Sequence, residues 1–400
     1  MAKQIARTMA ARHAQRSTPN RGNAQRVSDL CHHMEALAPS WSAADWDNVG
    51  LLVGSAAWPL RRILLTIDLT TEVLAEAKQG RYDAIVAYHP PIFRAVKNMR
   101  PGPSTQEGVA AEALASRIAV YSPHTALDAS DAGPNAVLAQ MAGIMSPVPI
   151  EAAREPQGRC KLVVFVPHEH VERVAAEIFD AGGGRIGEYS QCSFRIQGEG
   201  TFFGSDAANP TIGSRKRRES VPEIRLEVVF PRMRLAEVVR AVRGSHPYEE
   251  PAFDVYPLET PAADSIGQGR MGALMKPISL GALAGSLGRK LSAAIVAVVG
   301  KTSEKVRRGF VCVGAAGSLP FEISGGAIGT GDVVLTGEIR HHDALRYVRC
   351  GAAAIALGHW ASERPVLGPL SVRLRKALRG SAMVVSRRDR DPFTAVNSRK

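Results

Sequence analysis

Cysteine is scarce in this chain, and its spacing excludes two classes of site. The 400 residues hold an odd number of cysteines, and no two of them form a C-x-x-C pair. A disulfide framework and a thiolate zinc site both need paired or closely spaced cysteines, so we expect neither. The scarcity favours a reducing, intracellular compartment, and we predict a cytoplasmic protein. The cysteines are Cys31, Cys160, Cys192, Cys312 and Cys350.

Long apolar runs are also absent. No run approaches the roughly 20 residues that a membrane-spanning helix requires, so we expect no membrane partner. Residues 1–26 lack the apolar centre of a secretory signal and instead hold six basic residues and no acidic one. This composition predicts a basic disordered tail. A transit peptide would look similar, but the composition favours a disordered bacterial extension.

Two glycine-rich segments lack the context that nucleotide-binding motifs need. Gly300-Lys301-Thr302 resembles the end of a phosphate loop, but Ile295 stands where that motif has its first glycine. The spacing G-x-G-x-x-G occurs at 182–187, where it follows a predicted helix and precedes a strand, the reverse of the dinucleotide-binding arrangement. We therefore predict no nucleotide site of either class.

The basic charge is not concentrated on one segment of the folded part. The formal net charge of +12 would suit an acidic partner. Part of it belongs to residues 1–26, and the basic run at 215–218 has no interleaved aromatic residues, so a solvated loop is favoured there. We expect no nucleic-acid partner, whereas an anionic small molecule is compatible with the charge.

The rest of the sequence predicts an α/β fold. A hydrophobic content of 45% and a charged content of 22% are typical of a globular chain, long enough for two or three domains of about 150 residues. Short buried strands alternate with helices in 27–155, which predicts parallel strands with right-handed connections. The expected elements are a helix at 27–38, a strand at 62–68 whose Asp68 caps a helix at 70–78, a strand at 83–86, a helix at 107–116 and a strand at 118–121.

A different pattern interrupts the α/β pattern at 156–262. Its order of strand, helix, two strands at 191–204, strand, helix and strand predicts an inserted α+β domain of the ferredoxin-like type. The α/β pattern resumes in 263–386, and 387–400 is predicted to be a flexible tail. The expected elements of this last region are strands at 294–299, 310–313, 332–335 and 353–357 and helices at 280–290, 321–326 and 341–348.

Histidines and carboxylates follow the predicted buried strands. His89 follows one strand, and His124 and Asp128 follow the next. The carboxyl ends of parallel strands meet at one edge of a sheet, where ligands bind in open α/β folds. In the second region, His359 and Glu363 are four residues apart at the start of a predicted helix, so both side chains project from one face.

Two imidazoles and two carboxylates from this set could share a cation. They belong to His89, Asp128, His359 and Glu363, and such a mixed set suits zinc, iron, manganese or nickel rather than calcium. Taken singly, each residue has a simpler interpretation, because a histidine after a strand commonly caps or hydrogen-bonds and H-x-x-x-E is frequent by chance. The combination predicts a centre with one or two divalent metal ions.

Two further histidines follow a strand of the second region. His341 and His342 could act as acid or base beside the metal ions, since imidazole titrates near neutral pH. Alternatively, Asp343 caps the helix and the two histidines are simply exposed. Both interpretations remain open at this point.

Five segments together resemble the Nif-three-like family, whose members carry the label GTP cyclohydrolase 1 type 2 homologue. They occur in the order of the family over about 27–385. Within the insertion, His-Pro-Tyr-Glu-Glu-Pro at 246–251 resembles a module, related to nitrogen-regulatory and copper-tolerance trimers, that many bacterial members carry. The five segments are Trp-Asp-Asn-Val-Gly-Leu at 46–51, Tyr-His-Pro-Pro-Ile-Phe at 88–93, Ser-Pro-His-Thr-Ala-Leu-Asp at 122–128, Leu-Thr-Gly-Glu with two following histidines at 335–342, and Gly-His-Trp-Ala-Ser-Glu-Arg at 358–364.

The resemblance implies two similar α/β lobes that form a cleft for a dinuclear metal centre, in a hexameric ring with the metals facing an internal cavity. By motif position, it places Asp128, His359 and Glu363 with His89 as metal ligands, and His124 near the site. The position before His89 departs from the adjacent histidine pair of many bacterial members. The residue there is a tyrosine, so a second metal is either absent or held by carboxylates and water.

These observations predict a metal-dependent hydrolase that acts on a nucleotide-like or phosphorylated small molecule. His124, His341 or His342 would transfer protons. The alternative is a non-catalytic, metal-binding regulatory or chaperone-like assembly in which the insertion senses a small molecule or a partner. Family resemblance alone is a weak argument for a reaction.

Overall fold

The computed structural model describes residues 25–153, 158–187, 189–259, 265–322 and 328–395. These residues form two compact units. The larger unit combines the described residues up to 153 with those from 265 onward, and the smaller unit comprises 158–259. The predicted tail at 1–26 lies almost entirely outside the described residues. Within the described ranges, no helix has the length and apolar character needed to cross a membrane.

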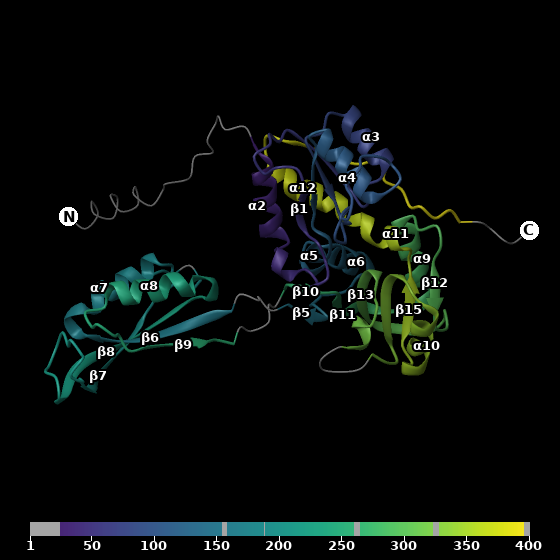
Figure 1. Ribbon diagram of the computed structural model, residues 1–400. Coiled ribbons are helices and arrows are strands. Elements are labelled where there is room, and N and C mark those ends of the chain that lie inside the picture. Colours follow the sequence, from purple (N-terminus) through teal and green to yellow (C-terminus); the bar gives the residue numbers. More distant parts are fainter. Residues whose placement is uncertain (1–24, 154–157, 188, 260–264, 323–327, 396–400) are drawn as a thin grey trace, which may run out of the picture. The chain divides into compact units, whose positions relative to one another are not determined.

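The first sheet of the larger unit is covered by helices on both faces. Its order is β1-β4-β3-β2-β16, antiparallel between the first two strands and parallel between the others. Figure 1 labels β1 and the helices α2, α3, α4 and α12 around this sheet. Ile63 and Leu65 pack with α2 and α12, and Leu64 packs with α3 and α4 on the other face. The elements are β1 (Gly50–Val53), β2 (Arg62–Thr66), β3 (Ala84–Ala87), β4 (Ala119–Ser122), β16 (Ala382–Val385), α2 (Val27–Leu37), α3 (Thr71–Gln79), α4 (Gln106–Ala115) and α12 (Leu367–Ala377).

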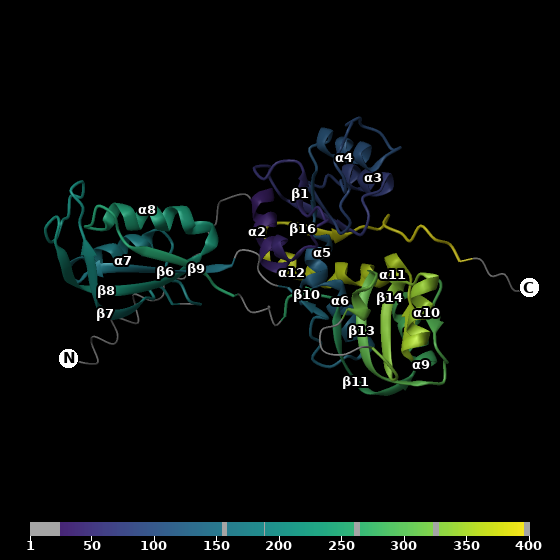
Figure 2. The ribbon, with the colours of Figure 1, turned by 60° about the horizontal axis from the view of Figure 1, so that its bottom comes forward.

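The second sheet has the order β11-β13-β14-β15-β12, with the three middle strands parallel and both edge strands antiparallel. Its helices also lie on both faces, with α6 and α9 on one and α10 on the other. The elements are β11 (Arg270–Ser279), β12 (Ala297–Val299), β13 (Lys305–Ala315), β14 (Asp332–Glu338), β15 (Ala353–Ala356), α5 (His124–Ala129), α6 (Pro134–Ala142), α9 (Leu280–Leu291), α10 (His341–Cys350) and α11 (His359–Glu363). Figure 2 shows α5, α6 and α11 between the two sheets.

Short elements complete the larger unit. A two-stranded ladder joins β5 (Glu151–Ala152) to β10 (Gly267–Gln268). Short 3-10 helices are η1 (Ser40–Ser42), η4 (Leu319–Phe321) and η5 (Arg364–Val366). The predicted helix at 321–326 falls largely on residues outside the described ranges.

Two strands of the five-stranded sheets were not predicted. β16 joins the first sheet although it comes from the opposite end of the chain, and β11 lies at the edge of the second sheet. The pairing of β11 with β13 is irregular between Ala273 and Ile278, a stretch that contains Pro277. A proline argues against a strand when the sequence is considered alone, but it is tolerated at an edge or an irregularity of a sheet, which is where Pro277 lies.

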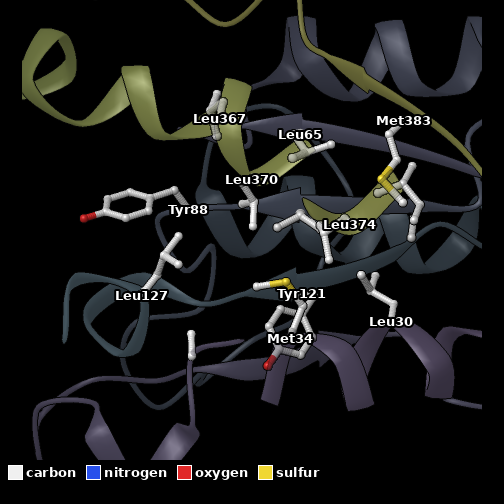
Figure 3. Packing of buried hydrophobic residues seen from close by; sticks show 14 of the residues in the cluster. Leu30, Met34, Leu65, Tyr88, Tyr121, Leu127, Leu367, Leu370, Leu374 and Met383 are labelled. Atoms are coloured by element: carbon white, nitrogen blue, oxygen red, sulfur yellow. The ribbon is translucent and has the colours of Figure 1, made fainter. Parts of the chain in front are cut away.

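One core cluster connects the first sheet to the candidate site. Figure 3 shows Leu367 and Leu370 of α12 and Leu30 of α2 directed into the same cluster. Tyr88 stands at the margin of this cluster with its hydroxyl pointing away from it, and the side chain is 1% exposed. The tyrosine ring is therefore part of the core, while its hydroxyl faces the region between the sheets.

The smaller unit is an antiparallel sheet with the order β7-β8-β6-β9 and two helices on one face (Figure 1). The segment at 191–204 was predicted as two strands, and this was wrong, because β7 is one strand paired with β8 along its whole length. The elements are β6 (Arg159–Pro167), η2 (His168–His170), α7 (Val171–Asp180), β7 (Phe194–Phe203), β8 (Arg218–Pro231), η3 (Arg232–Arg234), α8 (Leu235–Ser245) and β9 (Phe253–Pro257).

Candidate metal centre

Three histidines stand just beyond the carboxyl ends of parallel strands. His89 follows β3 by two residues, His124 begins α5 shortly after β4, and His359 begins α11 after β15. Because β3 and β4 are parallel neighbours, His89 and His124 lie at the same edge of the first sheet. Gly358, with φ +90°, makes the sharp turn that brings the second sheet's histidine into place.

Glu363 connects a histidine from each sheet. His359 and Glu363 are the first and last residues of α11, so their side chains share a face of the helix. His359 Nε2 lies 3.2 Å from Glu363 Oε1, and His89 Nε2 lies 3.3 Å from Glu363 Oε2. One ligand atom of each residue lies within 4.8 Å of the others, and Glu363 is only 3% exposed. The sequence therefore predicted all three members of this group.

The geometry of this group suits a metal ion. Glu363 Oε2 is buried and accepts no well-directed hydrogen bond, although His89 Nε2 is close to it. Two ligand atoms that are each about 2.0–2.1 Å from a tetrahedral ion lie about 3.3 Å from one another. Each histidine is at a similar distance from a carboxylate oxygen, His359 from Oε1 and His89 from Oε2. Two imidazole nitrogens and a carboxylate oxygen are also ligands that zinc, iron, manganese and nickel accept. The group can therefore hold a divalent metal ion.

Mutual contacts set the protonation of the metal-free group. Burial alone would lower the pKa of His89, but the hydrogen bond to Asp68 and the adjacent Glu363 carboxylate raise it to about 10. The hydrogen bond to Glu363 likewise raises the pKa of His359. Burial would raise the pKa of Glu363, yet its two histidine neighbours lower it. A metal ion that binds here must therefore displace protons from the imidazoles.

Each histidine of the group has a second carboxylate at its other ring nitrogen. Asp68 Oδ1 lies 2.9 Å from His89 Nδ1, and Glu338 Oε2 lies 3.6 Å from His359 Nδ1. Carboxylates in this position orient the ring and turn Nε2 toward a metal. The prediction that Asp68 caps α3 was wrong, because Thr70 is the N-cap and its hydroxyl accepts the first-turn hydrogen bond.

Two glycines provide the space in which the ligand atoms lie. A Cβ on Gly314, at the end of β13, would lie 2.4 Å from Glu363 Oε1 and 3.1 Å from His359 Nε2. A Cβ on Gly337, on the neighbouring strand β14, would lie 2.7 Å from the Cα of His359. Gly314 also has φ +62°, which disfavours any side chain. Gly314 was not predicted as part of the site, because the sequence shows only that it follows a predicted strand.

Asp128, the fourth predicted ligand, lies outside this close group. Its Oδ1 accepts a hydrogen bond from the buried Tyr88 hydroxyl. Burial raises the pKa of Asp128 to about 7, even though the Tyr88 hydrogen bond lowers it. In this arrangement one oxygen of the Asp128 carboxylate is bonded to Tyr88. The role of Asp128 as a metal ligand stays a prediction.

His124 is held by a buried carboxylate that the sequence analysis did not identify. Asp47 Oδ1 lies 2.8 Å from His124 Nδ1, and Asp47 Oδ2 accepts hydrogen bonds from the backbone and the hydroxyl of Thr125. Burial would raise the pKa of Asp47, but these hydrogen bonds lower it below its usual range. The ring centroid of His124 is 5.3 Å from that of His89. The oriented His124 imidazole is therefore adjacent to the candidate metal ligands.

His341 and His342 lie at the exposed start of α10. Their ring centroids are 5.5 Å apart. Among the described residues, no hydrogen bond or ion pair connects either ring to the close group. The expected alternative of a cap from Asp343 was wrong, since α10 has no side-chain cap and Asp343 instead contacts the Arg340 side chain at 3.1 Å. The catalytic role of the two histidines stays a prediction.

The fold and this site define a mixed α/β protein with several sheets and a His–His–Glu group, its carboxylate buried, that is able to hold a metal ion. Comparison with known sequences identifies the family to which the chain belongs. The chain belongs to the Duf34/NIF3 (NGG1p interacting factor 3) family, whose sequence model matches residues 25–392. The family resemblance found in the sequence is thus confirmed.

Relatives match over nearly the whole chain. The GTP cyclohydrolase 1 type 2 homolog of Bacillus subtilis (strain 168) is 34% identical over 375 residues, which cover 93% of this chain and 98% of the relative. The protein of the same name from Mycobacterium leprae is 34% identical, with 90% and 92% covered. The crystal structure of a Bacillus cereus protein related to NIF3 has a TM-score of 0.70 at 29% identity, covering 94% of this chain and 100% of that one.

Proposed function

We propose that this protein is a metal-dependent hydrolase acting on a nucleotide-like or phosphorylated small molecule. The observation that carries the proposal is the convergence of His89, His359 and the buried Glu363 on one point. When bound there, zinc, iron, manganese or nickel would polarise the substrate and lower the pKa of a water molecule. His124, oriented by Asp47, then takes or returns the proton beside that point.

The remaining polar groups have secondary roles in this proposal. Asp128 would bind a second ion or, with the Tyr88 hydroxyl, hold a substrate oxygen. His341 and His342 would carry protons for a substrate that extends along the end of β14, because α10 begins there. Either role is compatible with one metal ion in the close group.

Two exposed aromatic rings favour a substrate with a planar base. Trp46 is 62% exposed and Phe93 is 46% exposed, and their ring centroids are 5.6 Å apart. The Trp46 ring is also 6.0 Å from that of His124. Exposed apolar side chains that adjoin one another can mark a site for a partner or a ligand. The name of the relatives mentions GTP cyclohydrolase, which agrees with a nucleotide-like substrate.

Turnover by metal-loaded protein on a panel of nucleotides and phosphoesters tests the proposal. We expect activity that a chelator removes and that one of the four metals restores. His359→Ala should lose at least about 100-fold in kcat/KM, because it deletes a proposed metal ligand. Wild-type turnover in that variant would contradict the proposal. Fully loaded protein that forms no product from any substrate would favour the alternative, a non-catalytic regulatory or chaperone-like assembly.

Trp46→Ala should discriminate between substrates with and without a base. Stacking of one base on an aromatic ring contributes about 1–3 kcal/mol, so we expect KM to rise about 5-fold or more for a nucleotide. A phosphoester without a base should keep its KM, and Trp46→Phe should retain most of the nucleotide affinity. An equal rise of KM for both substrates would show that Trp46 does not recognise the base.

We further propose the finer architecture that the sequence predicted. Residues 27–155 and 263–386 would be two similar α/β lobes that form the metal-binding cleft, since each sheet places histidines after the carboxyl ends of its parallel strands. The exceptions to these bounds are α12 and β16, which pack with the first sheet. Residues 156–262 would be a ferredoxin-like domain, in agreement with its antiparallel sheet and two helices. By family resemblance, we propose a hexameric ring. The five free cysteines support a reducing compartment such as the cytoplasm, and the spread of the basic charge argues against a nucleic-acid partner.

A further inference from the structure

The smaller unit contains a cavity of about 480 Å³ with an acidic and apolar lining. This volume lies within the range of about 300–1,000 Å³ typical of small-molecule sites. Ile224 packs with α7 and α8 in the core, so its neighbour Glu223 points to the opposite face of the sheet, where the cavity lies. The described residues that line the cavity include no lysine, arginine or histidine, and its carboxylates come from Glu199, Glu223, Glu249 and Glu250.

Glu223 is the buried carboxylate of this cavity that has no cationic partner. It is 9% exposed, and no ion pair to it is found among the described residues. The neighbouring Tyr248 hydroxyl is buried and makes no well-directed hydrogen bond. Burial and the adjacent Glu223 carboxylate both raise the pKa of Tyr248, so the phenol stays protonated. An unpaired buried carboxylate is costly, and a cationic ligand would offset that cost.

Apart from the Tyr248 hydroxyl, which faces Glu223, the described polar groups leave this carboxylate available to a cationic ligand. A Cβ on Gly200 would lie 2.1 Å from Glu223 Oε2, so the carboxylate rests against the bare backbone of β7. Two other carboxylates are already engaged, because Glu249 accepts a hydrogen bond from the Asn209 backbone at 2.9 Å and Glu199 accepts one from the Ser220 hydroxyl. Glu223 is therefore the group around which a cation would bind.

The apolar part of the lining specifies an organic cation rather than a bare metal ion. Phe165, Phe202, Ile212 and Tyr248 contribute to the wall, and the rings of Phe202 and Tyr248 are 6.2 Å apart in a T-shaped arrangement. Aromatic faces attract ammonium groups and cover their apolar substituents. Among the described residues, three metal-ligating side chains converge at the centre of the larger unit and not here.

We propose that this cavity binds an organic ammonium ion with an apolar body of about the size of an aromatic ring. Its ammonium group bonds to Glu223, and its body packs against Phe202 and Tyr248. All the residues that line this site belong to the smaller unit, so the proposal does not depend on the proposed hydrolase centre.

Calorimetric titration of the full chain with phenethylammonium tests this site, with 3-phenylpropionate as a matched anion. We expect the ammonium ion to bind at least 10-fold more tightly than the anion. Glu223→Gln should weaken ammonium binding at least 10-fold. Glu227→Gln is the control, because Glu227 lies on the same face of β8 but is paired with Lys161 at 2.8 Å and Arg225 at 2.9 Å. It should bind as the wild type does.

A second variant separates the position of the carboxylate from its charge. Gly200→Ala keeps Glu223 but displaces it, and it should also weaken ammonium binding, with the thermal unfolding of each variant recorded to confirm folding. Equal binding of the anion, or unchanged ammonium binding in Glu223→Gln, would overturn the proposal. So would Glu223-dependent binding of Mn²⁺ in place of the ammonium ion, or a Glu223-dependent change in oligomeric mass with no amine bound, which would indicate a basic side chain from a second copy.

Discussion

Gly314→Ala is expected to abolish metal binding at the candidate centre while the protein stays folded. The new methyl group would lie 2.4 Å from Glu363 Oε1, well inside van der Waals contact, and Glu363 is held by α11. Either the carboxylate or the strand end must move, and both movements separate the ligand atoms. Metal per chain, measured by elemental analysis after purification without chelators, should fall below about one tenth of the wild-type value, because loss of a ligand costs at least 10–100-fold in affinity.

A matched glycine separates this steric effect from backbone strain. Gly317, three residues further along, has φ +55°, and a Cβ there would meet nothing within 4 Å. Gly314→Ala and Gly317→Ala should each lose about 1–3 kcal/mol of stability through the left-handed backbone. Only Gly314→Ala should lose its metal. Normal metal content in Gly314→Ala, or equal loss of metal in both variants, would show that metal binding does not depend on the space beside Glu363.

The sequence predicted the residues of the close group because their positions follow from regular geometry. His89 could be placed from the rule that parallel strands end at one edge of a sheet. His359 and Glu363 could be paired from the helical spacing of four residues. These rules depend on backbone periodicity, which a sequence displays directly.

The supporting residues could not be predicted in the same way. Asp68 follows a strand as His89 does, but its sequence fits a helix cap equally well, and only the tertiary fold turns its carboxylate to His89. Asp128 was placed at the same edge of the sheet, and its role as a ligand stays a prediction, but only the fold shows that its carboxylate accepts a hydrogen bond from Tyr88. β16 was missed because its partner strand β2 lies more than three hundred residues earlier, so no local pattern reveals the pairing.

Tyr88 should determine how many metal ions the centre holds. Its ring centroid lies 5.0 Å from that of His89 and 5.5 Å from that of His124, and its hydroxyl donates a hydrogen bond to Asp128. The close group has three ligand atoms for one ion, and a second ion beside it would need Asp128 and a further imidazole. We therefore expect about one tightly bound metal ion per chain in the wild type and about two in Tyr88→His.

Tyr88→Phe is the control for this prediction, because it removes the hydroxyl without adding a ligand. It should keep about one metal ion per chain, and it should lose about 1–3 kcal/mol of stability because the buried Asp128 loses its hydrogen-bond donor. Elemental analysis of the three proteins purified in parallel gives the metal content, and thermal unfolding gives the stability. Two ions in the wild type, or one in Tyr88→His, would mean that the tyrosine does not limit the site. Two ions in Tyr88→Phe would instead assign the limit to the hydroxyl bond alone, since Asp128, once released, would suffice for the second ion.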